Sequence, residues 1–66
     1  MKPNELKAEL TRNEKNYADM ASTLGISVIA FQRKINGDTE FKSSEISALK
    51  AALNLSAERV AEIFFN

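Results

Sequence analysis

Hydrophobic residues recur along this chain at the three- and four-residue spacing of amphipathic helices. Leu6 and Leu10 lie four residues apart among charged positions, which predicts a helix over residues 4–12. We find no strand-like alternation of polar and apolar residues, no internal repeat and no low-complexity linker. The pattern therefore predicts an all-α protein.

Polar residues mark both ends of the next helix. Asn16 followed by Asp19 resembles a capping box, in which each side chain bonds the backbone N–H of the other residue. Gly25 stands where helices commonly end, because glycine adopts the left-handed conformation without steric cost. We therefore expect a helix over residues 17–24. Its inward face carries Met20, Ala21 and Leu24.

A third helix follows after three residues. Ser27 is a favourable N-cap, and Phe31 and Ile35 form the apolar pair of a helix over about residues 28–35. Asn36-Gly37 then predicts the end of this helix. The second and third predicted helices are therefore joined by a very short connection.

Two more helices complete the pattern. After a connecting loop over residues 38–42, Ser43 or Ser44 begins the fourth helix, and Ser56 caps the fifth. Their inward residues are Ile46, Leu49, Leu53, Val60, Ile63 and Phe64. The sequence thus predicts five helices, with Asn54-Leu55 as the link between the last two.

Length and composition exclude several classes of protein. The 66 residues hold one domain, residues 1–66, with a shallow core, and the absence of cysteine excludes disulfides and thiolate zinc sites. The chain also lacks histidine and a glycine-rich phosphate loop, so we expect no enzymatic activity, no cofactor, no metal and no small-molecule ligand. No apolar run reaches the length of a signal sequence or a membrane span. We therefore expect a cytoplasmic protein with no membrane partner.

The charges of the chain balance. Nine basic residues face nine acidic ones, which argues against nonspecific coating of nucleic acid, because that relies on a net positive field. A small surplus of +1 falls on residues 27–42, where three basic residues stand against two acidic ones. Any binding to DNA must therefore come from a local face.

The second and third predicted helices match a helix-turn-helix unit, because they are short and joined by a turn that contains glycine. Ala21 must be small, since the two helices cross there, and Gly25 permits the sharp turn. The bulky apolar residues that would fill the angle between the helices are Met20, Leu24, Ile26 and Phe31. A steric requirement thus explains the type of residue at each of these positions.

Over residues 4 to about 64 the chain resembles the lambda-repressor-like family, also called the Cro/C1 or XRE type. The runs Phe31-Gln-Arg-Lys-Ile35-Asn-Gly37 and Glu40-Phe41-Lys-Ser-Ser-Glu45-Ile46 are similar to runs in small phage regulators of Gram-positive hosts. The resemblance implies a compact five-helix fold with a helix-turn-helix at about residues 17–35. It also implies that the third helix enters the major groove of a double-stranded DNA operator, and that repressors act as dimers on two-fold sites.

The sequence departs from the family pattern at several positions. Tyr17 stands where many members have a glutamine that reaches DNA, Lys15 where an apolar residue is common, and Lys42 where a hydroxyl cap is usual. Asp38 and Glu40 lie in the loop that approaches phosphate in relatives, where acids weaken affinity or turn the loop away. These departures concern how the protein would dock on DNA and leave the expected fold unchanged.

The outward side of the third helix follows from its core-facing pair, Phe31 and Ile35. The candidate base-reading residues are Val28, Ile29, Gln32 and Arg33. Arginine can read guanine bidentately, glutamine can read adenine, and an aliphatic side chain can touch a thymine methyl. The alternative is a solvated surface for the two polar residues and packing against the preceding helix for one of the two aliphatic residues.

Contacts to the DNA backbone are expected from hydroxyls, helix N-termini and lysines rather than from a dense basic patch. The candidates are Asn16, Tyr17, Ser27, Lys34, Asn36, Lys42, Ser43 and Ser44. Structural alternatives exist for these too: Tyr17 can belong to the core, Asn36 can merely end a helix, and Ser43 can merely cap one.

Two adjacent aromatic residues near the C-terminus point about 100° apart on a helix, so both cannot enter one small core. We place Phe64 in the core and Phe65 at an exposed apolar spot, either a contact of a weak homodimer or a frayed end.

The sequence therefore predicts a DNA-binding transcriptional regulator of phage or prophage type, Cro-like or repressor-like. The alternative is a protein-binding module that uses the same scaffold to dock a regulatory partner. The zero net charge, the acidic loop and the aliphatic pair Val28 and Ile29 lend weight to that alternative.

Overall fold

Five helices follow one another in the computed structural model, which describes residues 1–65; Asn66, the last residue of the expected domain, lies outside the described residues. The helices are α1 (Pro3–Arg12), α2 (Tyr17–Leu24), α3 (Val28–Ile35), α4 (Ser43–Ala52) and α5 (Ala57–Phe64). Residues 1–65 contain no strand, so the all-α prediction is confirmed. Among these helices, none has the length and apolar character needed to cross a membrane.

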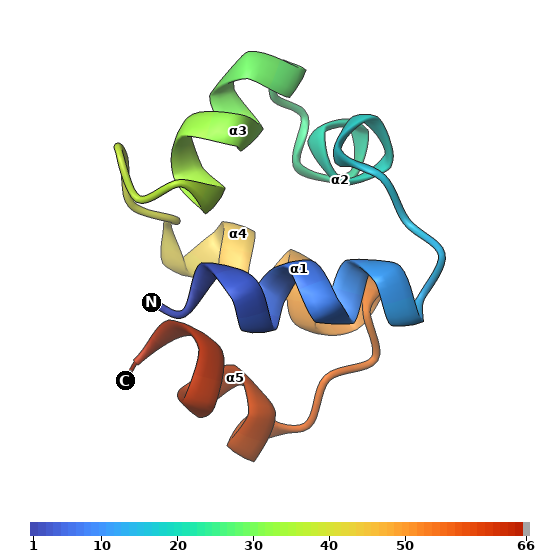
Figure 1. Ribbon diagram of the computed structural model, residues 1–66, viewed down its shortest axis with the longest axis vertical. Helices are drawn as coiled ribbons and strands as arrows, with labels where there is room; N and C mark the ends of the chain where they lie inside the picture. Colours follow the sequence, from blue (N-terminus) through green and yellow to red (C-terminus); the bar gives the residue numbers. More distant parts are fainter. Residues whose placement is uncertain (66) are drawn as a thin grey trace.

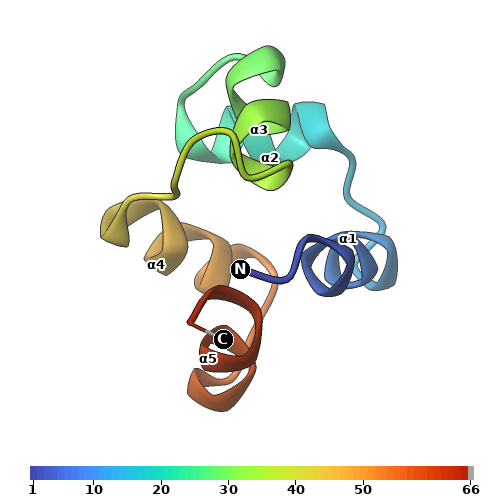
Figure 2. The same cartoon turned by 60° about the vertical axis from the view of Figure 1, so that its left-hand side comes forward.

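The helices stack in three tiers (Figures 1 and 2). α2 and α3 form the upper tier, α1 and α4 the middle one, and α5 lies at the opposite end from α3. α2 packs against both α3 and α4, and α5 packs against α4 and α1. The N–H of Lys2 donates to the carbonyl oxygen of Ile63 at 2.7 Å, which joins the two ends of the chain. The radius of gyration is 10.5 Å, close to the value of about 11 Å expected for a folded chain of this length.

Side-chain caps fix where several helices begin. The Oδ1 of Asn16 accepts the N–H of Asp19 at 2.7 Å, and the Oδ2 of Asp19 accepts the N–H of Asn16 at 2.9 Å, so the predicted capping box is confirmed. Ser27 and Ser56 cap α3 and α5 through their hydroxyls, each at 3.0 Å. α1 begins at Pro3, one residue before the predicted range, because proline is well suited to the first helical position.

The first four helices end in the same way. The residue after each helix or its cap has a left-handed backbone: Glu14 (φ 55°), Gly25 (φ 69°), Gly37 (φ 89°) and Asn54 (φ 53°). The N–H of the next residue then donates to a carbonyl oxygen five residues earlier, at 2.8–2.9 Å, as in a Schellman motif. These turns let the chain leave each helix sharply and keep the connections short.

The core collects one or more residues from every helix. Its fully or nearly fully buried hydrophobic members are Leu6, Leu10, Met20, Ala21, Phe31, Ile35, Leu49, Leu53, Leu55, Val60 and Ile63. Leu55 was expected in a link, but the left-handed turn at Asn54 directs it inward. Ile46 and Phe64, both expected in the core, are partly buried and pack against it.

Aromatic rings extend the core between α2 and α5. The rings of Tyr17 and Phe31, of Phe31 and Phe41, and of Phe41 and Phe64 meet edge to face, with centroids 5.4, 5.9 and 5.6 Å apart. Such edge-to-face pairs contribute beyond the area they bury. This row of rings connects the upper tier, which carries α3, to the C-terminal helix.

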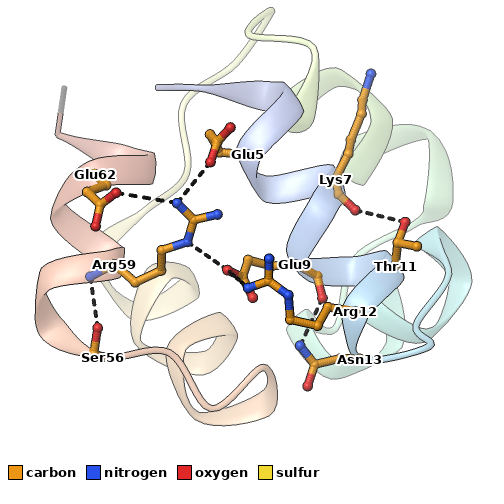
Figure 3. Close-up of polar contacts among 9 residues, drawn as sticks. All are labelled: Glu5, Lys7, Glu9, Thr11, Arg12, Asn13, Ser56, Arg59 and Glu62. Carbon is orange, nitrogen blue, oxygen red and sulfur yellow. Dashed lines mark hydrogen bonds and ion pairs between the residues drawn. The ribbon is translucent and has the colours of Figure 1, made fainter.

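A cluster of charges joins α1 to α5 (Figure 3). The Nε of Arg59 donates to Glu9 Oε2 at 2.6 Å, and its Nη1 lies 2.9 Å from Glu5 Oε1 and 3.5 Å from Glu62 Oε2. Arg12 also donates to Glu9 Oε2, at 2.9 Å. Hydrogen bonds to Glu9 and then Glu5 raise the pKa of Arg59. Because its residues lie on α1 and α5, and α5 is at the opposite end of the molecule from α3 (Figure 1), we assign the cluster to holding α1 and α5 together.

Candidate nucleic-acid interface

The connection between α2 and α3 consists of three residues, Gly25, Ile26 and Ser27. Gly25 has φ +69°, and no atom lies within 4 Å of the place where its Cβ would stand, so backbone conformation rather than space favours glycine. Ile26 is partly buried against the core, and Ser27 caps α3. Both the bounds of these two helices and the turn between them agree with the sequence prediction.

α3 has a buried side and an exposed side. Phe31 and Ile35 are completely buried, whereas Val28 is 41% and Ile29 65% exposed. Gln32 and Arg33 are exposed, and within residues 1–65 no hydrogen bond or ion pair engages either side chain. The four residues predicted to read bases therefore lie on the exposed surface of one helix, and the two polar ones have unused hydrogen-bonding groups.

Thr39 adds a feature that sequence reasoning missed. The N–H groups of Asp38 and Thr39 both donate to the carbonyl oxygen of Arg33, at 2.9 and 3.4 Å, which folds the loop back on the end of α3. Thr39 thereby lines a shallow hollow of about 350 Å³ beside Ile29 and Arg33. The Asp38 bond belongs to the turn that Asn36-Gly37 predicts, but no pattern in the sequence shows that Thr39 comes to lie beside Ile29 and Arg33.

Several residues around α2 and α3 that were predicted to contact the DNA backbone also make contacts within the protein. Asn16 and Ser27 are exposed, but the side-chain oxygen of each caps a helix. Tyr17 is half-buried, with its ring 5.4 Å from that of Phe31. Asn36 is exposed and ends α3 as its C-cap. Asn16 and Ser27 thus serve as the caps that the sequence also predicts, whereas Tyr17 packs against the core and Asn36 ends a helix, as their structural alternatives stated. The exposed ones among these residues remain accessible at the surface.

The start of α4 offers open backbone donors. Lys42 occupies the N-cap position without a side-chain cap bond, because an ammonium group has no acceptor. Its own N–H donates to Glu45 Oε1 at 2.8 Å. Ser43 and Ser44 are exposed at the first two helical positions, and in the described residues no side chain accepts from their N–H groups. A helix N-terminus of this kind attracts anions.

Lys34 was predicted to contact the DNA backbone, but its side chain is engaged within the protein. Its side chain is only 12% exposed, and its Nζ lies 3.0 Å from Glu45 Oε1 and 3.1 Å from the carbonyl oxygen of Glu40. The ammonium also stands 5.9 Å from the centre of the Phe41 ring. Because its charge is satisfied within the protein, we assign Lys34 a structural role in place of the phosphate contact.

Glu45 is held in its charged form by this arrangement. Burial alone would raise its pKa, but the N–H of Lys42 and the ammonium of Lys34 outweigh that effect and lower the pKa below its ordinary value of 4.5. With Lys34 and Glu45 paired, the exposed charges of residues 28–42 are Arg33, Lys42, Asp38 and Glu40. Two positive and two negative charges sum to zero, so this face has no strong net field.

Phe65 is 71% exposed, whereas Phe64 packs against the core, as the sequence predicts for the pair. A groove of about 560 Å³ beside Phe65 is lined in part by Phe41, Ile46 and Phe64. Exposed Met1 also lines this groove. This end of α5 therefore presents apolar surface to solvent.

Residues 1–65 bring together no group of three acidic, histidine or cysteine side chains able to hold a metal ion. No protein-family model matches the chain, and neither a curated protein nor a solved structure matches it with significance.

Proposed function

We propose that this protein is a sequence-specific double-stranded DNA-binding transcriptional regulator with a lambda-repressor-like helix-turn-helix fold, acting in the manner of a phage or prophage Cro or repressor. One observation carries the proposal: α3 exposes Val28, Ile29, Gln32 and Arg33 while its opposite side is completely buried. A short helix fixed on the surface with unengaged polar side chains and exposed aliphatic ones suits the chemistry of the major groove.

Each exposed side chain of α3 matches the chemistry of a group on the edge of a base. The unengaged guanidinium of Arg33 can donate two hydrogen bonds to guanine, and the amide of Gln32 can pair with adenine. Val28 and Ile29 can contact the methyl group of thymine, which would remove their apolar surface from water. The combination supports reading of a mixed sequence rather than contact with phosphates alone.

Backbone contacts would fix the position of α3 in the groove. The open N–H groups of Ser43 and Ser44, with the ammonium of Lys42 beside them, are the best supported candidates. Asn16 and Asn36 can donate through the amide groups of their exposed side chains, and Tyr17 and Ser27 lie at the starts of α2 and α3. Few charges take part, so binding would depend only weakly on salt.

We also propose a weak homodimer through the end of α5. Exposed Phe65 and the adjacent apolar groove support this contact, which would place two α3 helices on a two-fold site. Sedimentation with and without DNA tests it. A protein that stays monomeric at high concentration and binds one copy per duplex would contradict the dimer.

The second candidate function is docking of a regulatory protein on the same face. The 65% exposure of Ile29 favours it, since exposed aliphatic side chains also serve protein contacts, and the neutral charge of the face gives DNA no special advantage. The two candidates make different demands on Arg33, because a base-reading arginine imposes a preference among DNA sequences.

Selection from a randomised duplex library with the wild-type protein tests the proposal. The selected duplex and a scrambled duplex of the same composition are then titrated at several salt concentrations. We expect a preference of about 10³ or more for the selected duplex, with a shallow log–log salt slope of about −3 per protomer. Equal binding to both duplexes, or none, would favour the protein-docking alternative.

A further inference from the structure

The two elements that the proposed function brings to DNA are only indirectly packed together. α2 packs against both α3 and α4, whereas α3 and α4 approach each other much less. Residues 36–40, which leave α3, are all exposed, so this part of the connection adds little packing between them. Within residues 1–65 no ion pair other than that of Lys34 with Glu45 joins α3 to α4.

Lys34 bridges this gap from the last turn of α3. Its ammonium contacts Glu40 in the connecting loop and Glu45 in the first turn of α4, at 3.1 and 3.0 Å. It also stands over Phe41, whose ring packs edge to face on Phe31 of α3. One side chain thus holds three successive parts of the chain that leads into α4.

The acceptor on α4 is the same atom that organises the start of that helix. Glu45 Oε1 receives both the ammonium of Lys34 and the N–H of Lys42, at 3.0 and 2.8 Å. The side chains of Lys34 and Glu45 are 12% and 10% exposed, so the pair is largely shielded from water. The stability of such a pair depends on good alignment of its charged groups. Removing the Lys34 ammonium would therefore disturb the N-cap residue of α4 through Glu45.

We propose that Lys34 is a positioning residue that sets where the N-terminus of α4 stands relative to the exposed side of α3. It makes no contact with DNA. It fixes the position of the Ser43 and Ser44 N–H groups, which would bind phosphate, relative to Gln32 and Arg33, so that both kinds of contact can form at the same time. This inference rests on the proposed function and adds a coupling between its two kinds of contact.

The substitution Lys34→Met tests the inference, because methionine keeps an unbranched stem over Phe41 and removes the charge. Lys42→Met is the matched control, a neighbouring exposed lysine proposed to touch phosphate. Both variants are titrated with the selected and scrambled duplexes at several salt concentrations. Circular dichroism gives the folded fraction of each variant under the same conditions, so affinities are compared at equal amounts of folded protein.

We expect Lys34→Met to bind the selected duplex about tenfold more weakly, within the range usual for coupling between two parts of a site. Its salt slope should equal that of the wild type, whereas Lys42→Met should make the slope about one unit shallower. A slope about one unit shallower for Lys34→Met would overturn the proposal, since Lys34 would then touch phosphate. Wild-type affinity in the folded variant would assign Lys34 to stability alone.

Glu45→Gln provides a second test that keeps an acceptor for the N–H of Lys42 and removes only the charge. We expect a loss of affinity in the same direction, no further loss when Lys34→Met is added, and shifted amide NMR signals of Ser43 and Ser44. A folded Glu45→Gln protein with unshifted signals and unchanged affinity would overturn the proposal, even if Lys34→Met fails to fold. A wild-type protein that prefers no duplex would instead remove the proposed function itself.

Discussion

The carboxylate of Glu9 accepts a hydrogen bond from Arg59 at 2.6 Å across fifty positions of the chain. Its side chain is 5% exposed, whereas the neighbouring acceptor Glu5 is 47% exposed. Buried charged partners matter more than exposed ones, because water screens the exposed pair. The same arginine therefore has a strong and a weak partner on one helix.

We predict that Glu9→Gln lowers the melting temperature clearly and that Glu5→Gln lowers it little. Both variants remove one negative charge from α1 within reach of Arg59, so overall charge is matched. Thermal unfolding followed by circular dichroism measures both. Equal melting temperatures for the two variants would show that burial of Glu9 does not strengthen its bond to Arg59.

Ala21 lies where α2 packs on its neighbours and is 2% exposed. We predict that Ala21→Leu destabilises the protein by about 1–3 kcal/mol through overpacking, which is enough to unfold much of a domain this small. Ala18→Leu, at an exposed position of the same helix, should be nearly neutral. Urea unfolding compares them, and an equally stable Ala21→Leu protein would place the helix crossing elsewhere.

Glu14 follows the C-cap of α1 and has a left-handed backbone, φ 55°, although it has a side chain. Glycine adopts this conformation without steric cost, so we predict that Glu14→Gly stabilises the protein by about 0.5–1 kcal/mol. Ala8→Gly, at an exposed position inside α1, should instead destabilise it by about 1 kcal/mol. The free energies of unfolding in urea give both values, and destabilisation by both substitutions would refute the strain at Glu14.

The helix ends could be read from the sequence because their signals are local. Asn16 with Asp19, Ser27 and Ser56 are caps that act within three residues, and Gly25 and Gly37 mark turns by their own backbone preference. The bounds of α2 and α3 could be predicted directly from these caps and turns. The exposure of Val28, Ile29, Gln32 and Arg33 also followed, since a helix that buries Phe31 and Ile35 turns its opposite side outward.

Features that depend on distant residues could not be read in this way. Lys34 looked like a surface lysine of α3, because nothing local shows that Glu45 lies within 3.0 Å of its ammonium. Leu55 looked like part of a link until the turn at Asn54 directed it into the core. The bond of Glu9 to Arg59 joins opposite ends of the chain and has no pattern in sequence.

The lowered pKa of Glu45 predicts an effect of acid on stability. Lys34 and Lys42 favour its charged form in the folded protein, so the stabilisation is present above about pH 4.5 and is lost as the pH falls through the lower folded pKa. We expect the free energy of unfolding to fall less steeply in acid for Glu45→Gln than for the wild type. Parallel curves of stability against pH for the two proteins would contradict this.

The central claim is that α3 reads bases, and titration of Arg33→Ala against the selected duplex tests it most directly. Removing a base-reading arginine should cost about 1–3 kcal/mol on that duplex and relax the preference at one base pair. Lys50→Ala, which removes an exposed charge in the last turn of α4, is the matched control and should retain that preference. Wild-type binding and an unchanged base preference in Arg33→Ala, and likewise in Gln32→Ala, would contradict the claim that α3 is the reading helix.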